Sequence, residues 1–222
     1  MKRKILILLF LLSFPSVLYV VLTTGKHHAL RLPYLGPKQL APNGKDTLYH
    51  TVPSFKFVNQ AGDTISDKFY DGKIYVAAYF YTSCNTNACK RMAAQILRLQ
   101  EKFGYTNGLI QMLYHTIKPE SDSVPALSAY AKMVHADTSM WNFVTGDKAN
   151  LLDIAKQGYL IEQDDTENPS EMLVLVDKEK RVRGMYSGTK IQGVNDLIDG
   201  IKALMAEYVI KETETKKIEQ KR

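Results

Sequence analysis

Two cysteines, Cys84 and Cys89, are the residues whose type and spacing could do chemistry in this chain, which contains no other cysteine. A thiol pair can form a reversible disulfide or supply soft metal ligands. Residues five apart on a regular helix lie about 140° from each other around its axis, so we expect residues 85–87 to form a loop, with Asn87 capping a following helix. A bond between the two cysteines would close a loop too short to stabilise the fold by restricting the unfolded chain. The pair is therefore expected to have a chemical role rather than a structural one.

The surroundings of the pair favour a reactive thiol. Cys84 follows an apolar run at 74–80, typical of a buried strand, and precedes helical spacing at 88–103. The positive end of a helix stabilises a thiolate, and Lys90 and Arg91 add positive charge. In an exchange reaction we expect Cys84 to attack and Cys89 to resolve the mixed disulfide.

The rest of the pattern predicts an α/β domain with a mixed central sheet flanked by helices, because strand-like and helix-like segments alternate. A first hairpin is expected around the turn at 59–63, and a closing hairpin and helix favour an antiparallel edge. Further strands are expected at 109–114, 141–144, 172–176 and 181–186, and further helices at 123–133, 148–157 and 194–208.

The N-terminus predicts a membrane anchor at residues 1–24. Lys2, Arg3 and Lys4 precede an uncharged, mostly apolar run at 5–22, long enough to cross a bilayer. The positive flank places the N-terminus in the cytoplasm and the domain on the periplasmic or outer side of the inner (plasma) membrane. A cleaved signal peptide is the alternative, although the run lacks an Ala-x-Ala site. No cysteine directly follows the run, so an N-terminal lipid attachment there is excluded.

The remaining organisation is a juxtamembrane linker at 25–49, a domain at 50–208 and a charged tail at 209–222, expected as a frayed helix end. The adjacent His27 and His28 fit a solvated linker, although a histidine pair can also bind metal. The net charge of +6 shows no basic stripe with interleaved aromatic residues, which argues against nucleic-acid binding.

Several segments in order resemble the SCO/SenC family of copper-handling proteins with a thioredoxin-like fold, which assist cytochrome c oxidase assembly. The resemblance covers roughly residues 30–208. It rests on the segments 46–55, 62–66, 79–84, 117–123, 141–146, 175–177 and 184–188. It implies a thioredoxin-like fold, a Cys84–Cys89 site that is redox-active and copper-binding, and a membrane or exported protein partner such as an oxidase subunit.

The chain also departs from the family pattern. The family places three residues between its cysteines, whereas four lie here, and Lys90 replaces a proline. The family's copper site adds a histidine, and the matching position here is Pro169. Met172 could supply a thioether instead, although a core role is favoured, and His115 could approach the site, although a structural role is favoured for it. His50 and His135 are also expected to be structural.

Three functions therefore remain open. The first is copper delivery or thiol redox maintenance during cytochrome c oxidase assembly, with Cys84 and Cys89 as metal ligands and reactive thiols. The second is a copper-independent thiol–disulfide oxidoreductase acting through the same two residues. The third is a partner-binding module with a degenerate site.

Overall fold

The computed structural model describes residues 14, 31–163 and 168–219. The chain divides into two compact units, Met1–Arg31 and Leu32–Arg222, and the account below concerns the second. The anchor expected at 1–24 falls outside the described residues, apart from Phe14. Within the described ranges, no helix is both long enough and apolar enough to cross a membrane.

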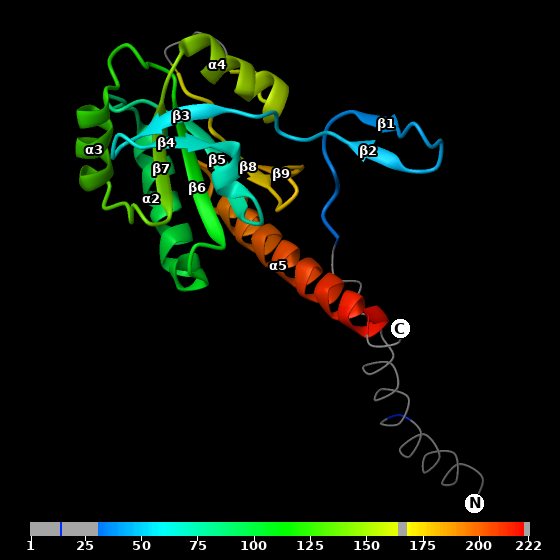
Figure 1. Cartoon of the computed structure of the whole chain (residues 1–222). Helices are drawn as coiled ribbons and strands as arrows, with labels where there is room; N and C mark the ends of the chain where they lie inside the picture. The colour runs from blue at the N-terminus through cyan, green and yellow to red at the C-terminus, as the bar shows by residue number, and fades with distance from the viewer. Residues whose placement is uncertain (1–13, 15–30, 164–167, 220–222) are drawn as a thin grey trace, which may run out of the picture. The chain divides into compact units, whose positions relative to one another are not determined.

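A seven-stranded mixed sheet forms the centre of the second unit, as the sequence predicts (Figure 1). Strand β5 pairs in parallel with β6, which pairs in parallel with β7, whereas the other pairings are antiparallel. All seven residues of β5 are buried, which explains its uninterrupted apolar sequence. In spatial order the strands are β4 (Thr64–Ser66), β3 (Lys56–Asn59), β7 (Trp141–Thr145), β6 (Ile110–Thr116), β5 (Ile74–Phe80), β8 (Met172–Val176) and β9 (Val182–Ser187).

Helices cover both faces of the sheet. The first core cluster packs α2 (Asn87–Phe103), α3 (Val124–Met133) and α5 (Ile191–Glu219) against one face, which includes Ala78 and Phe80 of β5. The second core cluster packs α4 (Lys148–Asp153) and the π-helical turn Ile154–Gly158 against the other face, which includes Ala77 and Tyr79. Alternate residues of β5 thus serve opposite cores, because successive side chains of a strand point to opposite faces. Short 3₁₀ turns occupy Asp67–Tyr70 and Gly104–Thr106.

The segment expected as a plain linker contains a hairpin in its described part. Strands β1 (Lys38–Leu40) and β2 (Thr47–Tyr49) pair with each other, and the Asn43 side chain accepts hydrogen bonds from two backbone amides in their turn. The residues before the hairpin are tied to β9, where Arg183 donates to the carbonyls of Leu32 and Pro33. The hairpin was not predicted, because its strands are exposed and show no apolar periodicity. The segment before it is held by Arg183, which is distant in the sequence.

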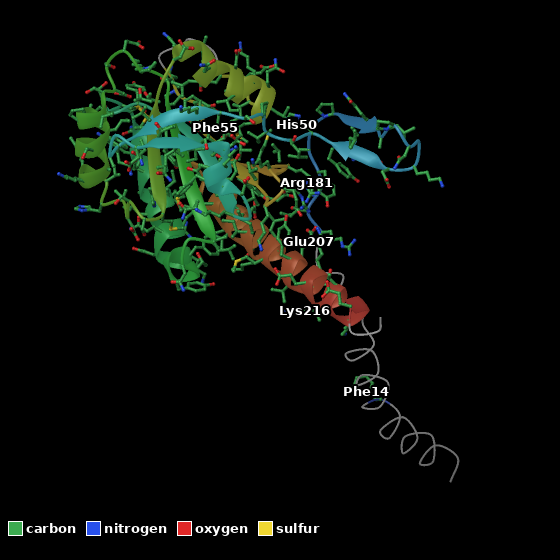
Figure 2. All side chains as sticks on the ribbon, in the orientation of Figure 1. Phe14, His50, Phe55, Arg181, Glu207 and Lys216 are labelled. Carbon is green, nitrogen blue, oxygen red and sulfur yellow. A yellow bond between two sulfur atoms is a disulfide. The ribbon has the colours of Figure 1, made fainter. Side chains whose placement is uncertain are left out.

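The charged tail, expected as a frayed and solvated helix end, continues helix α5 in its described part. Helix α5 runs without a break to Glu219, well past the predicted end at 208. Figure 2 shows Lys216 on this extension and Glu207 nearer the sheet, where Glu207 accepts a hydrogen bond from Arg183. The extension is also tied to the turn between β8 and β9, where Lys211 pairs with Glu179 and Glu212 pairs with Lys178.

Candidate functional site

Cys84 and Cys89 form a disulfide at the carboxyl end of β5, where the chain turns into α2. Their Cα atoms lie 6.2 Å apart, within the usual range of about 4.4–6.8 Å. Both residues are partly exposed. The structure therefore brings the two sulfurs together at the junction of a buried strand and a helix start, as the sequence predicts.

Thr86, rather than Asn87, caps helix α2. The Thr86 hydroxyl accepts a hydrogen bond of 3.2 Å from the Cys89 amide, and Asn87 is the first helical residue. The backbone of Thr86 is extended, which lets its short side chain reach the third helical amide. The same oxygen lies 3.6 Å from the Cys84 sulfur. Because a disulfide sulfur carries no hydrogen, the Thr86 hydroxyl is the donor in this contact.

Asp122 positions the turn that carries Cys84, a role that the sequence did not reveal. Its buried carboxylate accepts from the Thr82 amide at 3.1 Å, from the Thr82 hydroxyl at 2.5 Å and from the Thr116 hydroxyl. Thr82 follows β5 and Thr116 ends β6, so one side chain joins the ends of two parallel strands. The one sequence signal was indirect, since Asp122 belongs to the segment 117–123 that carries the family resemblance.

A mainly apolar cavity of about 110 Å³ lies beside the disulfide, and both cysteines line it. Tyr114 and Trp141 are buried in its wall, and among the described residues neither the Tyr114 hydroxyl nor the Trp141 indole nitrogen has a hydrogen-bond partner. Burial raises the pKa of Tyr114 well above its usual value, so this hydroxyl stays protonated and able to donate. Other wall residues come from β5, β7, α2 and α3: Phe80, Phe143, Ala88, Met92, Ala93, Tyr130 and Val134.

His115 lies on the other face of the sheet and does not join the cysteines. Its ring stacks on Tyr79 in the second core cluster, with Nδ1 3.3 Å from the Ala78 carbonyl and Nε2 3.5 Å from the Tyr159 hydroxyl. Burial lowers the pKa of His115 to about 3, so the ring is neutral at physiological pH. This confirms the structural role that the sequence favoured.

Met172, His50 and His135 are not among the residues that line the cavity with the two cysteines. Met172 packs against the second core cluster. His50 Nε2 lies 2.9 Å from the Gly158 carbonyl, and His135 occupies the left-handed position that ends α3. Pro169, at the family's histidine position, lines the cavity. His27 and His28 fall outside the described residues.

The described residues therefore do not form the three-ligand copper site that the family resemblance implies. They include no group of three His, Cys, Asp or Glu side chains able to hold a metal ion. The pair could offer two sulfurs after reduction, but the third position holds a proline.

Comparisons with known proteins agree with this geometry. The family model described as SCO1/SenC matches residues 43–206. The SCO1 protein homolog of Bacillus subtilis is 25% identical over 165 residues, which cover 72% of this chain and 85% of that protein. A SCO1/SenC family lipoprotein from Bacillus anthracis is 27% identical with a TM-score of 0.64, over 70% of this chain and 95% of the solved one.

Two further solved structures share the fold. BsSco, described as having a disulfide switch and as a member of the Sco family of cytochrome c oxidase assembly proteins, gives a TM-score of 0.61 at 24% identity, over 72% of this chain and 96% of its own. Arabidopsis thaliana ScoI with copper bound gives 0.59 at 20% identity, over 71% and 99%. These matches confirm the α/β thioredoxin-like fold with a mixed sheet flanked by helices.

Proposed function

Because the chain belongs to the SCO1/SenC family, we propose that it assists cytochrome c oxidase assembly by thiol–disulfide exchange through Cys84 and Cys89. The observation that carries this proposal is the disulfide itself, formed at a partly exposed helix start by the chain's two cysteines. Its loop is too small to contribute much to folding, and its sulfurs are close enough to bond again after each reduction.

The exchange follows from the positions of the two sulfurs. A partner thiolate attacks Cys84 Sγ and forms a bond to it, while the Cys84–Cys89 bond breaks and Cys89 leaves as a thiolate. Cys89 lies in the first turn of α2, where free amides and the helix dipole stabilise that anion. A second partner thiol then displaces Cys84, so two electrons pass from the partner dithiol to the pair. In the reverse direction Cys84 attacks and Cys89 resolves.

Copper delivery is the second candidate, with copper as cargo. Copper(I) prefers soft thiolates, which the reduced pair would supply, and the copper-bound Arabidopsis ScoI shares this fold. The described residues supply no third ligand beside the pair, which places copper delivery behind thiol–disulfide exchange. Copper(I) binding by the reduced protein, compared with Cys84→Ser, tests this candidate, and equal binding by the two proteins would remove it.

We further propose that residues 1–24 anchor the chain in the inner membrane, with the domain on its outer side. The three cationic residues before the apolar run support this orientation. The partner would then be an exported or membrane protein such as an oxidase subunit. The Bacillus anthracis relative is described as a lipoprotein, although in this chain no cysteine directly follows the apolar run.

Complementation tests the proposal in cells that lack this chain. The wild-type chain should restore cytochrome c oxidase activity, and the Cys84→Ser/Cys89→Ser variant, produced at the same level, should not. The Cys89→Ser variant should accumulate a mixed disulfide through Cys84, whereas Cys84→Ser should not. Full activity of the double variant would instead favour a partner-binding module.

A further inference from the structure

The last part of α5 carries an exposed face that combines apolar and cationic side chains. Helix α5 continues past the sheet (Figure 1), and Val209 and Ile210 on this extension are 63% and 42% exposed. Thr213, Lys216 and Lys217 follow at helical spacing and are also exposed. Within the described chain, no ion pair joins either lysine to a carboxylate. We call these five residues the outer face of α5.

Three carboxylates of the same stretch project from other sides of the helix. Glu207 pairs with Arg183, and Glu212 pairs with Lys178, so both are turned toward the sheet and its β8–β9 turn. Glu219 lies seven positions after Glu212 and therefore projects from nearly the same side as Glu212. The lysines of the outer face consequently meet solvent without these carboxylates beside them.

This charge distribution fits an anionic lipid surface. Residues 211–222 contain five cationic and three acidic residues. Helices that lie on such surfaces combine cationic and apolar side chains, and each lysine near the surface strengthens binding about fivefold. Nearer its start, α5 instead exposes Asp196 and Asp199, of which Asp199 pairs with Lys202. Anionic lipid would therefore attract the end of α5 and not its beginning.

The proposed anchor would bring this end of α5 to the membrane. Residues 25–31 separate the anchor from Leu32 and can span at most about 25 Å. The Leu32 carbonyl accepts a hydrogen bond from Arg183 Nη2, which also donates to Glu207. The chain thus enters the domain beside α5, two residues before Val209. A surface held so close to lipid needs only a weak affinity, because the tether raises its effective concentration.

The disulfide and the end of α5 lie at opposite edges of the sheet. Cys84 follows the carboxyl end of β5, whereas Tyr75, near the start of β5, pairs with Val176 at the end of β8. The turn after Val176 carries Glu179, which pairs with Lys211 of α5. Lipid bound at the end of α5 would therefore leave the disulfide on the far side of the domain.

We propose that the outer face of α5 binds the anionic surface of the bilayer and holds the Cys84–Cys89 disulfide away from it. The partner is then an exported domain whose thiols project from the membrane. This inference rests on the proposed anchor, and it adds an orientation to the proposed thiol–disulfide exchange.

Hydrogen exchange in nanodiscs tests lipid binding by the full-length protein. The backbone amides of 209–219 should exchange about tenfold more slowly with an equal mixture of phosphatidylglycerol and phosphatidylcholine than with phosphatidylcholine alone. Lys216→Glu/Lys217→Glu should remove this difference. Lys102→Glu/Lys132→Glu, the same charge change at exposed positions of α2 and α3, should keep it. Equal exchange in both nanodiscs would overturn the inference while the anchor stands. A chain that enters neither nanodisc would overturn both.

A lipid that bears a thiol, phosphatidylthioethanol, tests the orientation in the anionic nanodiscs. Two successive displacements by its thiolates would reduce the protein disulfide and leave a lipid disulfide. The wild type should be reduced about tenfold more slowly than Lys216→Glu/Lys217→Glu, because the bound helix lowers the concentration of lipid thiols near the disulfide. Soluble dithiothreitol should reduce both proteins equally. Equal rates with the lipid thiol would overturn the orientation. A disulfide that dithiothreitol also fails to reduce would contradict thiol–disulfide exchange, and hydrogen exchange would still decide lipid binding.

Discussion

The hydroxyl of Thr86 connects the two halves of the site, since it caps the Cys89 amide and approaches the Cys84 sulfur. Reduction should strengthen the second contact, because a hydrogen bond to a charged group is stronger than one to a neutral group. The hydroxyl should therefore stabilise the reduced form of the pair relative to the disulfide.

Replacing this hydroxyl should shift the redox equilibrium. In Thr86→Val the reduced form should lose about 1 kcal/mol, so the equilibrium constant with glutathione should move about fivefold toward the disulfide. The measurement is the oxidised fraction in a series of glutathione buffers. Thr86→Ser is the control and should behave like the wild type. Equal constants for the Val and Ser variants would show that the hydroxyl has no such role.

Pro169 offers a gain-of-function test of the incomplete copper site. Because it lines the cavity with both cysteines, Pro169→His would place an imidazole near the pair. The reduced variant should bind copper(I) about tenfold more tightly than the wild type, measured by competition with a chromogenic chelator. Ser170→His, one position away and not part of the cavity lining, should bind like the wild type. An unchanged affinity for Pro169→His would refute this explanation of the missing ligand.

At the scale of residues, the cysteine pair could be predicted from the sequence, but the residues that position it could not. Two cysteines between a strand pattern and a helix pattern are visible in a linear sequence. Asp122 and the cavity walls were not, because they reach the site through the pairing of β5, β6 and β7. The helix cap was placed one residue late, because Asn and Thr are both common capping residues.

At the scale of elements, β6 presents opposite faces to two cores. Tyr114 lines the cavity, whereas the next residue, His115, lies among Phe57, Tyr79 and Tyr159. Burial also raises the pKa values of Tyr79 and Tyr159 well above normal, so these two neighbours of His115 are uncharged. Among the described residues only the Ala78 carbonyl favours the protonated ring, and it does not offset the cost that burial imposes on protonating His115.

This environment predicts acid sensitivity. The pKa of His115 is about 3 in the folded state and about 6.5 in an unfolded chain. Between pH 6.5 and 3 the histidine is protonated in the unfolded state and neutral in the folded state. The free energy of unfolding therefore falls as the pH decreases. From pH 6.5 to 4.5 this histidine should remove about 2 kcal/mol from the free energy of unfolding.

Urea unfolding at several pH values isolates the effect. His115→Phe should lose that share of the pH dependence, whereas carboxylates should still contribute theirs. His135→Asn is the control, because His135 is exposed and asparagine tolerates its positive φ. An unchanged slope in His115→Phe would contradict the assigned pKa shift.

The elements themselves were largely predictable, since buried strands and amphipathic helices leave clear apolar patterns. The apolar pattern did not predict the elements that are held by contacts other than apolar burial. The β1–β2 hairpin is exposed, and the segment before it is held by contacts such as the Leu35 amide with the Val182 carbonyl. The exposed end of α5 is tied to the β8–β9 turn by ion pairs of Lys211 with Glu179 and of Glu212 with Lys178. Neither type of support produces the hydrophobic period on which the prediction relied.

At the scale of the whole molecule, the proposed anchor predicts membrane association. The full chain should sediment with membranes and resist extraction by high salt and alkaline carbonate, because about 18 apolar residues partition into lipid. A chain that begins at Leu32 should remain in the supernatant. Sequencing the N-terminus of the mature protein distinguishes an anchor from a cleaved signal. A full-length chain that is released by salt alone would contradict the anchor.

The reduction potential of the Cys84–Cys89 pair tests the central claim most directly. We predict one two-electron transition for the purified protein, with a midpoint between about −120 and −270 mV, the range of proteins that exchange disulfides. Mass spectrometry after alkylation at each potential would count the free thiols. A midpoint below about −300 mV, as in structural disulfides, would contradict exchange as the function of this site.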